Sequence, residues 1–105
     1  MKQLIYASTI YSQLPDQSHT KEVWSVCWSP SEKYLATGSD DTTVKIWMKD
    51  PNASSDTFVV IRTLTGHSKR VSSLTFTSED ELVSGSWDKT IRVWIKTNEG
   101  IWKLN

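Results

Sequence analysis

Two sets of histidine, serine and aspartate residues occur in this chain of 105 residues, and these residue types together could form a nucleophilic hydrolase site. The sets are His19, Ser39 and Asp41, followed by His67, Ser86 and Asp88. In such a site the imidazole removes a proton from the serine hydroxyl while the carboxylate orients the imidazole. A catalytic serine must be exposed beside an oxyanion hole, whereas each of these serines is expected at a strand end, before a tight turn. The repetition of the set in one small chain favours a structural role, so we predict no catalytic residues and no enzymatic activity.

Other site chemistries have little support in the sequence. Cys27 is the only cysteine, which excludes a disulfide framework and a cysteine-rich zinc site and favours a reducing, intracellular compartment, cytoplasmic or nuclear. It falls within a predicted strand, where we interpret it as a small buried hydrophobe. His19 and His67 stand 48 residues apart without a third ligand, and the chain has only four glycines, with no phosphate-binding loop among them. We therefore expect no metal, no cofactor and no small-molecule substrate.

The charges of the chain balance, with 12 Lys plus Arg against 12 Asp plus Glu and a formal net charge of zero. This balance gives no electrostatic footprint for nucleic acid or for an anionic membrane. No apolar run approaches the roughly 20 residues that a membrane-spanning helix needs, and the first apolar stretch is too short for a secretory signal. The composition predicts a soluble globular domain that binds neither nucleic acid nor a membrane.

The elements that must position these residues are predicted to be strands. The chain has only three alanines, whereas Val, Ile, Thr and aromatic residues are abundant. Short runs of these types alternate with turn signals such as Asp40–Asp41–Thr42, which indicates an all-β protein. Strands are expected at about 22–29, 34–39, 43–48, 57–64, 70–77, 81–86, 90–95 and 101–105, with a further strand at Leu4–Leu14.

The segment from His67 onward repeats the segment from His19 onward. The offset is 48 residues at first and 47 residues after the first turn. Matched pairs are His19 and His67, Val23 and Val71, Trp28 and Phe76, Leu35 and Leu82, Gly38 and Gly85, Asp41 and Asp88, and Trp47 and Trp94. A repeat of this kind predicts two copies of one four-stranded unit.

The second copy carries the most specific motif, Gly66–His67 followed by Ser-Gly-Ser-Trp-Asp-Lys-Thr-Ile-Arg-Val-Trp over residues 84–94. It resembles a blade of a WD-repeat β-propeller, and the likeness covers roughly residues 18–95. The first copy has Ser18–His19 in place of the usual Gly-His, and both copies lack the Asp of the name-giving pair, having Trp47–Met48 and Trp94–Ile95. The resemblance implies two four-stranded antiparallel blades of a partial propeller, each with its first strand lining a central channel.

The resemblance also implies a role for the repeated polar residues, which would form a buried hydrogen-bond relay in each blade. The relay ties the loop that enters the blade to the sheet. Its residues would be His19, Ser39, Asp41 and Trp47 in blade one, and His67, Ser86, Asp88 and Trp94 in blade two. Each bond should contribute about 0.5 to 1.5 kcal/mol, and more is lost when one partner is deleted.

The resemblance predicts how the chain divides. Residues 1–17 would supply the leading strand of a neighbouring blade, residues 18–65 form blade one, and residues 66–105 form blade two with its last strand cut short. Closed propellers need roughly 4 to 8 blades, so two blades leave open faces. Two alternatives follow: the chain is a fragment of a larger propeller, or copies of it complete one as a head-to-tail homo-oligomer.

Partners of such propellers commonly bind at the rim of the channel. The positions are two alternate residues of each first strand and the residue before the turn aspartate. Carried over to this chain, they are Glu22, Trp24, Asp40, Arg70, Ser72 and Trp87. Trp24 and Trp87 are surplus to packing because other aromatic residues fill the core positions of the repeat, and Trp beside Arg is typical of a binding hot spot. The polar loop Lys49–Asp56 is expected to be a solvated connection.

The function that follows is a non-catalytic scaffold whose rim binds a protein or peptide. The alternative is an accessory subunit of an enzyme complex. For the alternative, the junction from Trp47–Met48–Lys49 to Thr57–Phe58 loosely resembles WD-repeat proteins that act in targeting for cytosolic iron–sulfur protein assembly.

Overall fold

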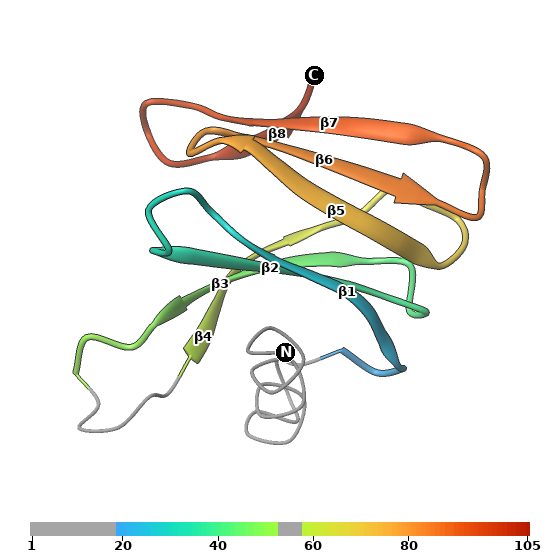
Figure 1. The fold of residues 1–105 in the computed structure, drawn as a ribbon, viewed down its shortest axis with the longest axis horizontal. Helices are drawn as coiled ribbons and strands as arrows, with labels where there is room; N and C mark the ends of the chain where they lie inside the picture. Colours follow the sequence, from blue (N-terminus) through green and yellow to red (C-terminus); the bar gives the residue numbers. More distant parts are fainter. Residues whose placement is uncertain (1–18, 53–57) are drawn as a thin grey trace.

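The computed structural model describes residues 19–52 and 58–105, which form two four-stranded antiparallel sheets and no helix (Figure 1). The strands are β1 (Val23–Trp28), β2 (Tyr34–Ser39), β3 (Val44–Lys49), β4 (Phe58–Leu64), β5 (Val71–Ser78), β6 (Glu81–Ser86), β7 (Ile91–Lys96) and β8 (Trp102–Leu104). The all-β prediction is confirmed, and each of these strands begins and ends within one residue of its predicted bounds. The strand predicted at Leu4–Leu14 lies outside the described residues, as does the end of the loop Lys49–Asp56. Within the described ranges, nothing forms a helix long and apolar enough to span a bilayer.

Each sheet is a meander in which neighbouring strands are also neighbours in the chain. The turn between the second and third strand of each sheet is the same in both copies. Thr42 and Lys89 have φ angles of 75° and 72°, and their backbone N–H groups donate to the carbonyls of Ser39 and Ser86 at 3.2 Å. Few residues other than glycine adopt this left-handed conformation. The turn directs the aspartate at its second central position, Asp41 or Asp88, back toward the loop that enters the blade.

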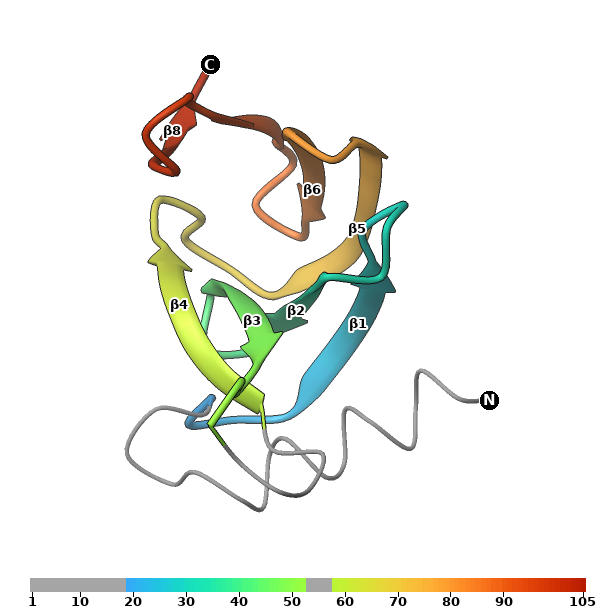
Figure 2. The same ribbon diagram turned by 90° about the vertical axis from the view of Figure 1, so that its left-hand side faces the viewer.

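The two sheets pack face to face, and β1 and β5 lie side by side (Figure 2). The interface is apolar because one face of each strand carries the aliphatic and aromatic residues of its alternating pattern. The first sheet contributes Tyr34, Ala36, Val44, Ile46 and Leu64, and the second contributes Val71, Leu82, Trp94 and Trp102. The opposite face of the first sheet has a second apolar cluster of Leu35, Trp47 and Phe58. Both faces of the first sheet are therefore used for packing.

A close approach between the sheets involves a glycine. A Cβ atom built on Gly38 of β2 would lie 2.6 Å from Cγ1 of Val71 at the start of β5. Such a distance is well inside van der Waals contact, so only a residue without a side chain fits here. Gly38 thus lets the two sheets touch where β2 ends and β5 begins.

An aromatic pair closes the other end of each sheet. Trp28 and Phe58 in the first sheet, and Phe76 and Trp102 in the second, have ring centroids 6.0 Å apart in edge-to-face geometry. Trp28 and Phe76 are matched by the repeat. Their partners on the last strand of each sheet are exchanged in type, with Phe58 facing the tryptophan and Trp102 facing the phenylalanine. Trp102 is buried, so it anchors the short strand β8 to the sheet.

Candidate functional site

The polar side chains of blade one form a buried chain of hydrogen bonds. His19 Nδ1 lies 2.9 Å from Asp41 Oδ2, and His19 Nε2 lies 2.6 Å from Thr37 Oγ1. Trp47 Nε1 donates to the same Thr37 oxygen at 2.9 Å. All four side chains are buried or nearly so, and together they join the entering loop, the turn, β2 and β3. The arrangement leaves few unpaired donors inside the blade.

Blade two repeats this chain of hydrogen bonds atom for atom. His67 Nδ1 lies 2.9 Å from Asp88 Oδ2, and His67 Nε2 lies 2.8 Å from Ser84 Oγ. Trp94 Nε1 donates to Ser84 Oγ at 2.9 Å. A serine thus replaces the threonine of blade one, with the hydroxyl in the same place.

The hydroxyl between histidine and tryptophan belongs to Thr37 in blade one and to Ser84 in blade two, and neither residue is in the predicted relay. Ser39 Oγ instead donates to the Lys21 carbonyl at 3.1 Å and accepts from the Asp41 backbone N–H at 3.1 Å. Ser86 makes the matching bonds to the Lys69 carbonyl and the Asp88 N–H, at 3.1 and 3.0 Å. The reason is position: Ser39 and Ser86 are the last residues of β2 and β6, beyond the reach of the indole on the next strand. They still tie the entering loop to the turn.

The sequence held a signal for the relay hydroxyls that was missed. Thr37 and Ser84 are matched at the offset of 47 residues, and both are hydroxyl residues in the middle of their strands. Thr43 and Thr90 are matched in the same way, and their hydroxyls donate to Asp41 Oδ1, at 2.6 Å, and to Asp88 Oδ1.

The contacts of Ser84, His67 and Asp88 have the connectivity of a catalytic triad, but the geometry does not suit catalysis. Ser84 has no exposed surface, and its oxygen already accepts a hydrogen bond from Trp94. His67 is 5% exposed. A substrate carbonyl cannot approach Ser84 Oγ without opening the blade, and acyl transfer needs that approach.

The carboxylates of the relay are held ionised by their partners. Burial opposes ionisation of Asp41, but hydrogen bonds from His19 and Thr43 outweigh it and hold the pKa of this carboxyl well below its usual range. The pKa of Asp88 is lowered by the hydrogen bond from Thr90 first, against the effect of burial, and then by His67. Both carboxylates are therefore charged acceptors at neutral pH.

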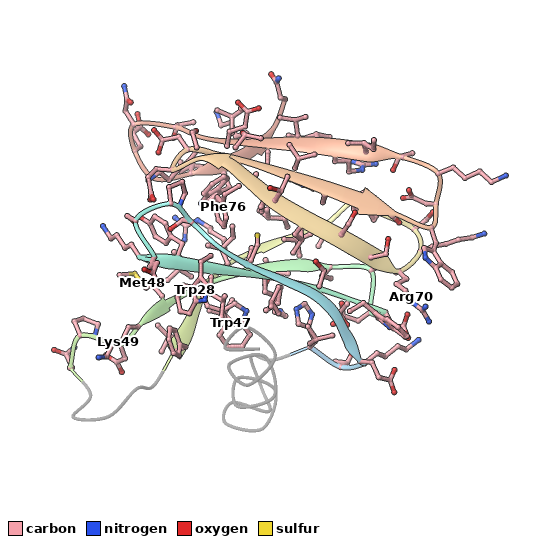
Figure 3. All side chains as sticks on the ribbon, in the orientation of Figure 1. Trp28, Trp47, Met48, Lys49, Arg70 and Phe76 are labelled. Atoms are coloured by element: carbon pink, nitrogen blue, oxygen red, sulfur yellow. The ribbon has the colours of Figure 1, made fainter. Side chains whose placement is uncertain are left out.

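The predicted rim residues gather at the end of the molecule where β1 and β5 begin. Arg70 lies there, away from the end that carries Met48 and Lys49 (Figure 3). Its guanidinium carbon lies 3.8 Å from the ring centroid of Trp24 and 4.0 Å from that of Trp87, so the cation is between two indoles. We call Trp24, Asp40, Arg70 and Trp87 the rim cluster.

Asp40 fixes the orientation of the cation. Arg70 Nε donates to Asp40 Oδ1, and Arg70 Nη2 donates to Asp40 Oδ2 at 3.3 Å. The guanidinium holds the pKa of Asp40 below its usual value, and a hydrogen bond from Trp24 adds to the effect. The rim cluster is thus assembled across the junction of the two blades, since Trp24 and Asp40 come from the first sheet and Arg70 and Trp87 from the second.

A β-bulge explains why Trp24 points to this end. The pairing of β1 with β2 shifts between Val23 and Ser25, which leaves Trp24 as the extra residue, and the matched shift in β5 falls at Ser72. A bulge redirects the side chain of its extra residue out of the alternation of the strand. Trp24 is 51% exposed as a result, and Trp87, in the turn after β6, is 60% exposed.

The two other predicted rim residues, Glu22 and Ser72, stand two residues from Trp24 and from Arg70 in the chain. The Glu22 carbonyl accepts from the Asp40 N–H at 2.9 Å, just as the Arg70 carbonyl accepts from the Trp87 N–H at 3.0 Å. Glu22 is exposed, and Ser72 is half-buried on β5. The structure therefore brings four of the six predicted residues into one cluster.

Cys27 is not arranged for reaction. It is half-buried against the core between the sheets, and burial raises the pKa of its thiol to about 12, although a hydrogen bond with the backbone of Phe76 acts in the opposite direction. A thiol with so high a pKa is almost entirely protonated at neutral pH and is a poor nucleophile. Among the described residues, no group of three or more His, Cys, Asp or Glu side chains could hold a metal ion.

The outer face of the second sheet carries apolar side chains that no part of residues 19–52 or 58–105 covers. Ile91 is 75% exposed, whereas Val44, its match in blade one, is fully buried against the second sheet. Ile91 also lines a shallow hollow of about 370 Å³ with Val93 and Leu104. This face has the residue pattern of a blade junction.

Comparisons with known proteins agree with the repeat and the fold. The family model described as "WD domain, G-beta repeat" matches residues 10–48 and 58–94. Among solved structures, the Saccharomyces cerevisiae Sqt1 crystal structure is similar with a TM-score of 0.71 and 28% identity, over 84% of this chain and 23% of that one. The structure titled "Structure of U3-55K" is similar with a TM-score of 0.64 and 31% identity, over 82% of this chain and 24% of that one.

Curated relatives match over the same region. The "Probable cytosolic iron-sulfur protein assembly protein 1" of Eremothecium gossypii is 36% identical over 70 residues, which cover 67% of this chain and 21% of that protein. "Protein HIRA" of Dictyostelium discoideum is 34% identical over 71 residues, which cover 63% of this chain and 6% of that protein. The chain thus spans about a fifth of the first relative and much less of the second.

Proposed function

Because the chain belongs to the WD-repeat family of β-propeller proteins, we propose that it is a non-catalytic interaction scaffold that binds a protein or peptide segment through the rim cluster. The family fold is a scaffold of repeated sheets and supports a role in protein interaction. The buried state of Ser84 and His67 supports the absence of catalysis. The Eremothecium relative is named for cytosolic iron–sulfur protein assembly, which supports a location inside the cell.

The observation that carries this proposal is the exposure of two tryptophans around one arginine. Trp24 and Trp87 keep more than half of their surface open although each is stacked on Arg70. Large aromatic side chains held rigid in this way lose little conformational entropy when a partner covers them. Trp and Arg are also the residue types in which binding energy concentrates.

Partner binding is expected to depend on the rim cluster more than on the loop Lys49–Asp56. Changing Trp24, Arg70 or Trp87 to alanine should each weaken binding by about 2 kcal/mol or more, which corresponds to about thirtyfold in Kd. A Gly-Ser replacement of residues 50–56 should weaken binding by less than about threefold, because a polar loop loses conformational entropy when it is ordered by a contact. Isothermal titration calorimetry with a candidate partner measures both.

Each variant must first melt like the parent chain, so that a loss of binding is not a loss of folding. If the loop replacement abolishes binding while the three alanine variants bind normally, then the partner docks on the outer edge of the blade and the rim assignment fails.

The uncovered face of the second sheet supports the partial-propeller interpretation. We propose that a further WD blade covers Ile91 and Val93, supplied either by a longer chain or by a second copy. Blade one supports this, because the residues matched to these two, Val44 and Ile46, are fully buried against the second sheet.

A second candidate function is a part in cytosolic iron–sulfur protein assembly, and the names of several relatives favour it. The relative from Eremothecium gossypii and the one from Kluyveromyces lactis, which is 33% identical over 76 residues, bear this name. In this case iron–sulfur apoproteins should co-purify with the chain from cell extract, and Arg70→Ala should reduce their recovery at least about tenfold. Recovery of chromatin, trafficking or ubiquitin-ligase proteins instead would contradict this candidate and leave the scaffold proposal in place.

A further inference from the structure

We propose that the group recognised by the rim cluster is a carboxylate on an acidic segment of the partner protein, paired with the open end of the Arg70 guanidinium. This inference rests on the proposed function and adds the chemistry of the partner to it. It follows from which parts of Arg70 are already occupied.

Arg70 has one edge free for a ligand. Of the five N–H donors of a guanidinium, one on Nε and one on Nη2 point to Asp40. The two faces of the group are covered by Trp24 and Trp87. The two N–H groups of Nη1 and the second one of Nη2 have no hydrogen-bond partner among residues 19–52 and 58–105. An approaching group must therefore come in edge-on, between the two indoles.

A carboxylate fits this edge better than other common groups. One free N–H of Nη1 and the free N–H of Nη2 lie in one plane and run parallel, which matches the two oxygens of a carboxylate in a bidentate pair. Asp40 already holds the guanidinium still, so little freedom is lost when the second carboxylate binds. The indoles on either side exclude water from the pair, which strengthens the electrostatic attraction.

The charge around the cluster favours an acidic partner as well. Asp40 and Arg70 neutralise each other, and the carboxylates of the two relays are engaged with the histidines. Three lysines that stand within three residues of cluster members in the sequence, Lys21, Lys69 and Lys89, are exposed, as is Glu22. A cationic segment would meet these lysines and Arg70 itself, whereas an acidic segment meets an excess of positive charge.

The test uses the 105-residue chain and an array of short peptides with blocked ends. Each peptide that contains glutamate or aspartate beside apolar residues is matched by a peptide with glutamine or asparagine. Among the peptides that bind, the acidic members should bind about tenfold more tightly or better than their amide counterparts. Binding should weaken as salt is added, since the lysines also contribute.

Arg70→Lys separates the geometry from the charge. Lysine keeps the positive charge but not the planar fork, so the preference for acidic peptides should fall about tenfold or more. Arg62→Lys is the matched control, because Arg62 is exposed on β4 and bonds only to the carbonyls of Ile61 and Gly100 among the described residues. This control should leave binding unchanged, and both variants should melt like the parent.

The outcomes distinguish this inference from the proposed function. If acidic and amide peptides bind equally well and Trp24→Ala still abolishes binding, the proposal of a carboxylate ligand is overturned while the rim cluster remains the binding site. Binding that is indifferent to Trp24, Arg70 and Trp87 would overturn both. Tighter binding of a short single-stranded oligonucleotide, or of basic peptides, would overturn the proposal of a carboxylate ligand. The proposal would also be overturned if no acidic peptide binds at about 1 mM.

Discussion

Replacing Trp94 with alanine is expected to lower the free energy of unfolding by about 3 to 5 kcal/mol. Trp94 is 4% exposed and lies in the core between the two sheets, so its removal leaves a large cavity at the junction of the blades. The change also removes the indole N–H that donates to Ser84 Oγ, inside a blade where water cannot replace it. Because the free energy of unfolding of a small domain is about 5 to 15 kcal/mol in all, the variant should be largely unfolded in mild denaturant.

The control for this prediction is Trp87→Ala. Trp87 is 60% exposed and contacts Arg70 by stacking, so its loss should cost less than about 1 kcal/mol. Urea denaturation followed by circular dichroism measures both variants. Similar losses for the two would show that Trp87 is a packing residue, and the rim cluster would then lose its place as a binding surface.

The relay aspartates are expected to be the next most sensitive positions. Asp88→Ala and Asp41→Ala should each lower the melting temperature by several degrees, because each carboxylate binds a histidine, a threonine hydroxyl and backbone N–H groups of the entering loop and the turn. Without these acceptors the donors are stranded in a site that holds few alternatives. A calorimetric scan of each variant is the measurement.

Acid should remove the same stabilisation in the parent chain. The pKa values of Asp41 and Asp88 are lower in the folded state than in the unfolded state, so the two groups stabilise the fold fully above the unfolded value, about pH 4. The stabilisation is lost as the pH falls from about 4 toward the lower folded values. The double alanine variant should therefore show a shallower loss of melting temperature below pH 4. If the alanine variants of Asp41 and Asp88 instead melt like the parent chain but no longer bind a partner, these residues form a functional site.

The repeat made the fold predictable from the sequence. Once His67 is matched to His19 and Trp94 to Trp47, two four-stranded units follow, and the turn residues between the matches limit each strand to a few positions. The predicted relay lacks Thr37 and Ser84 for a local reason. Ser39 and Ser86 stand nearest the aspartates in the sequence, but side chains two residues apart on a strand point the same way and at different depths. Thr37 and Ser84 lie two residues further inside their strands, where the indole of Trp47 or Trp94 reaches them.

The rim cluster shows a different limit of sequence reasoning. The family resemblance indicated the positions of Trp24, Arg70 and Trp87, yet it could not predict that the arginine lies between the two indoles. That contact depends on the bulge at Trp24 and on how closely the second sheet packs against the first. Both are properties of the junction between blades, whereas the sequence pattern describes one blade at a time.

The contact of Gly38 with Val71 has a consequence for the curvature of any ring that such blades complete. Two sheets that touch through a glycine can tilt toward each other at that end, whereas a methyl group there would act as a wedge and widen the angle between them. In a closed ring the angles between successive blades must add up to one full turn, so an error at one joint has to be absorbed by all the others. The absence of a side chain at Gly38 therefore helps to set the angle between one blade and the next.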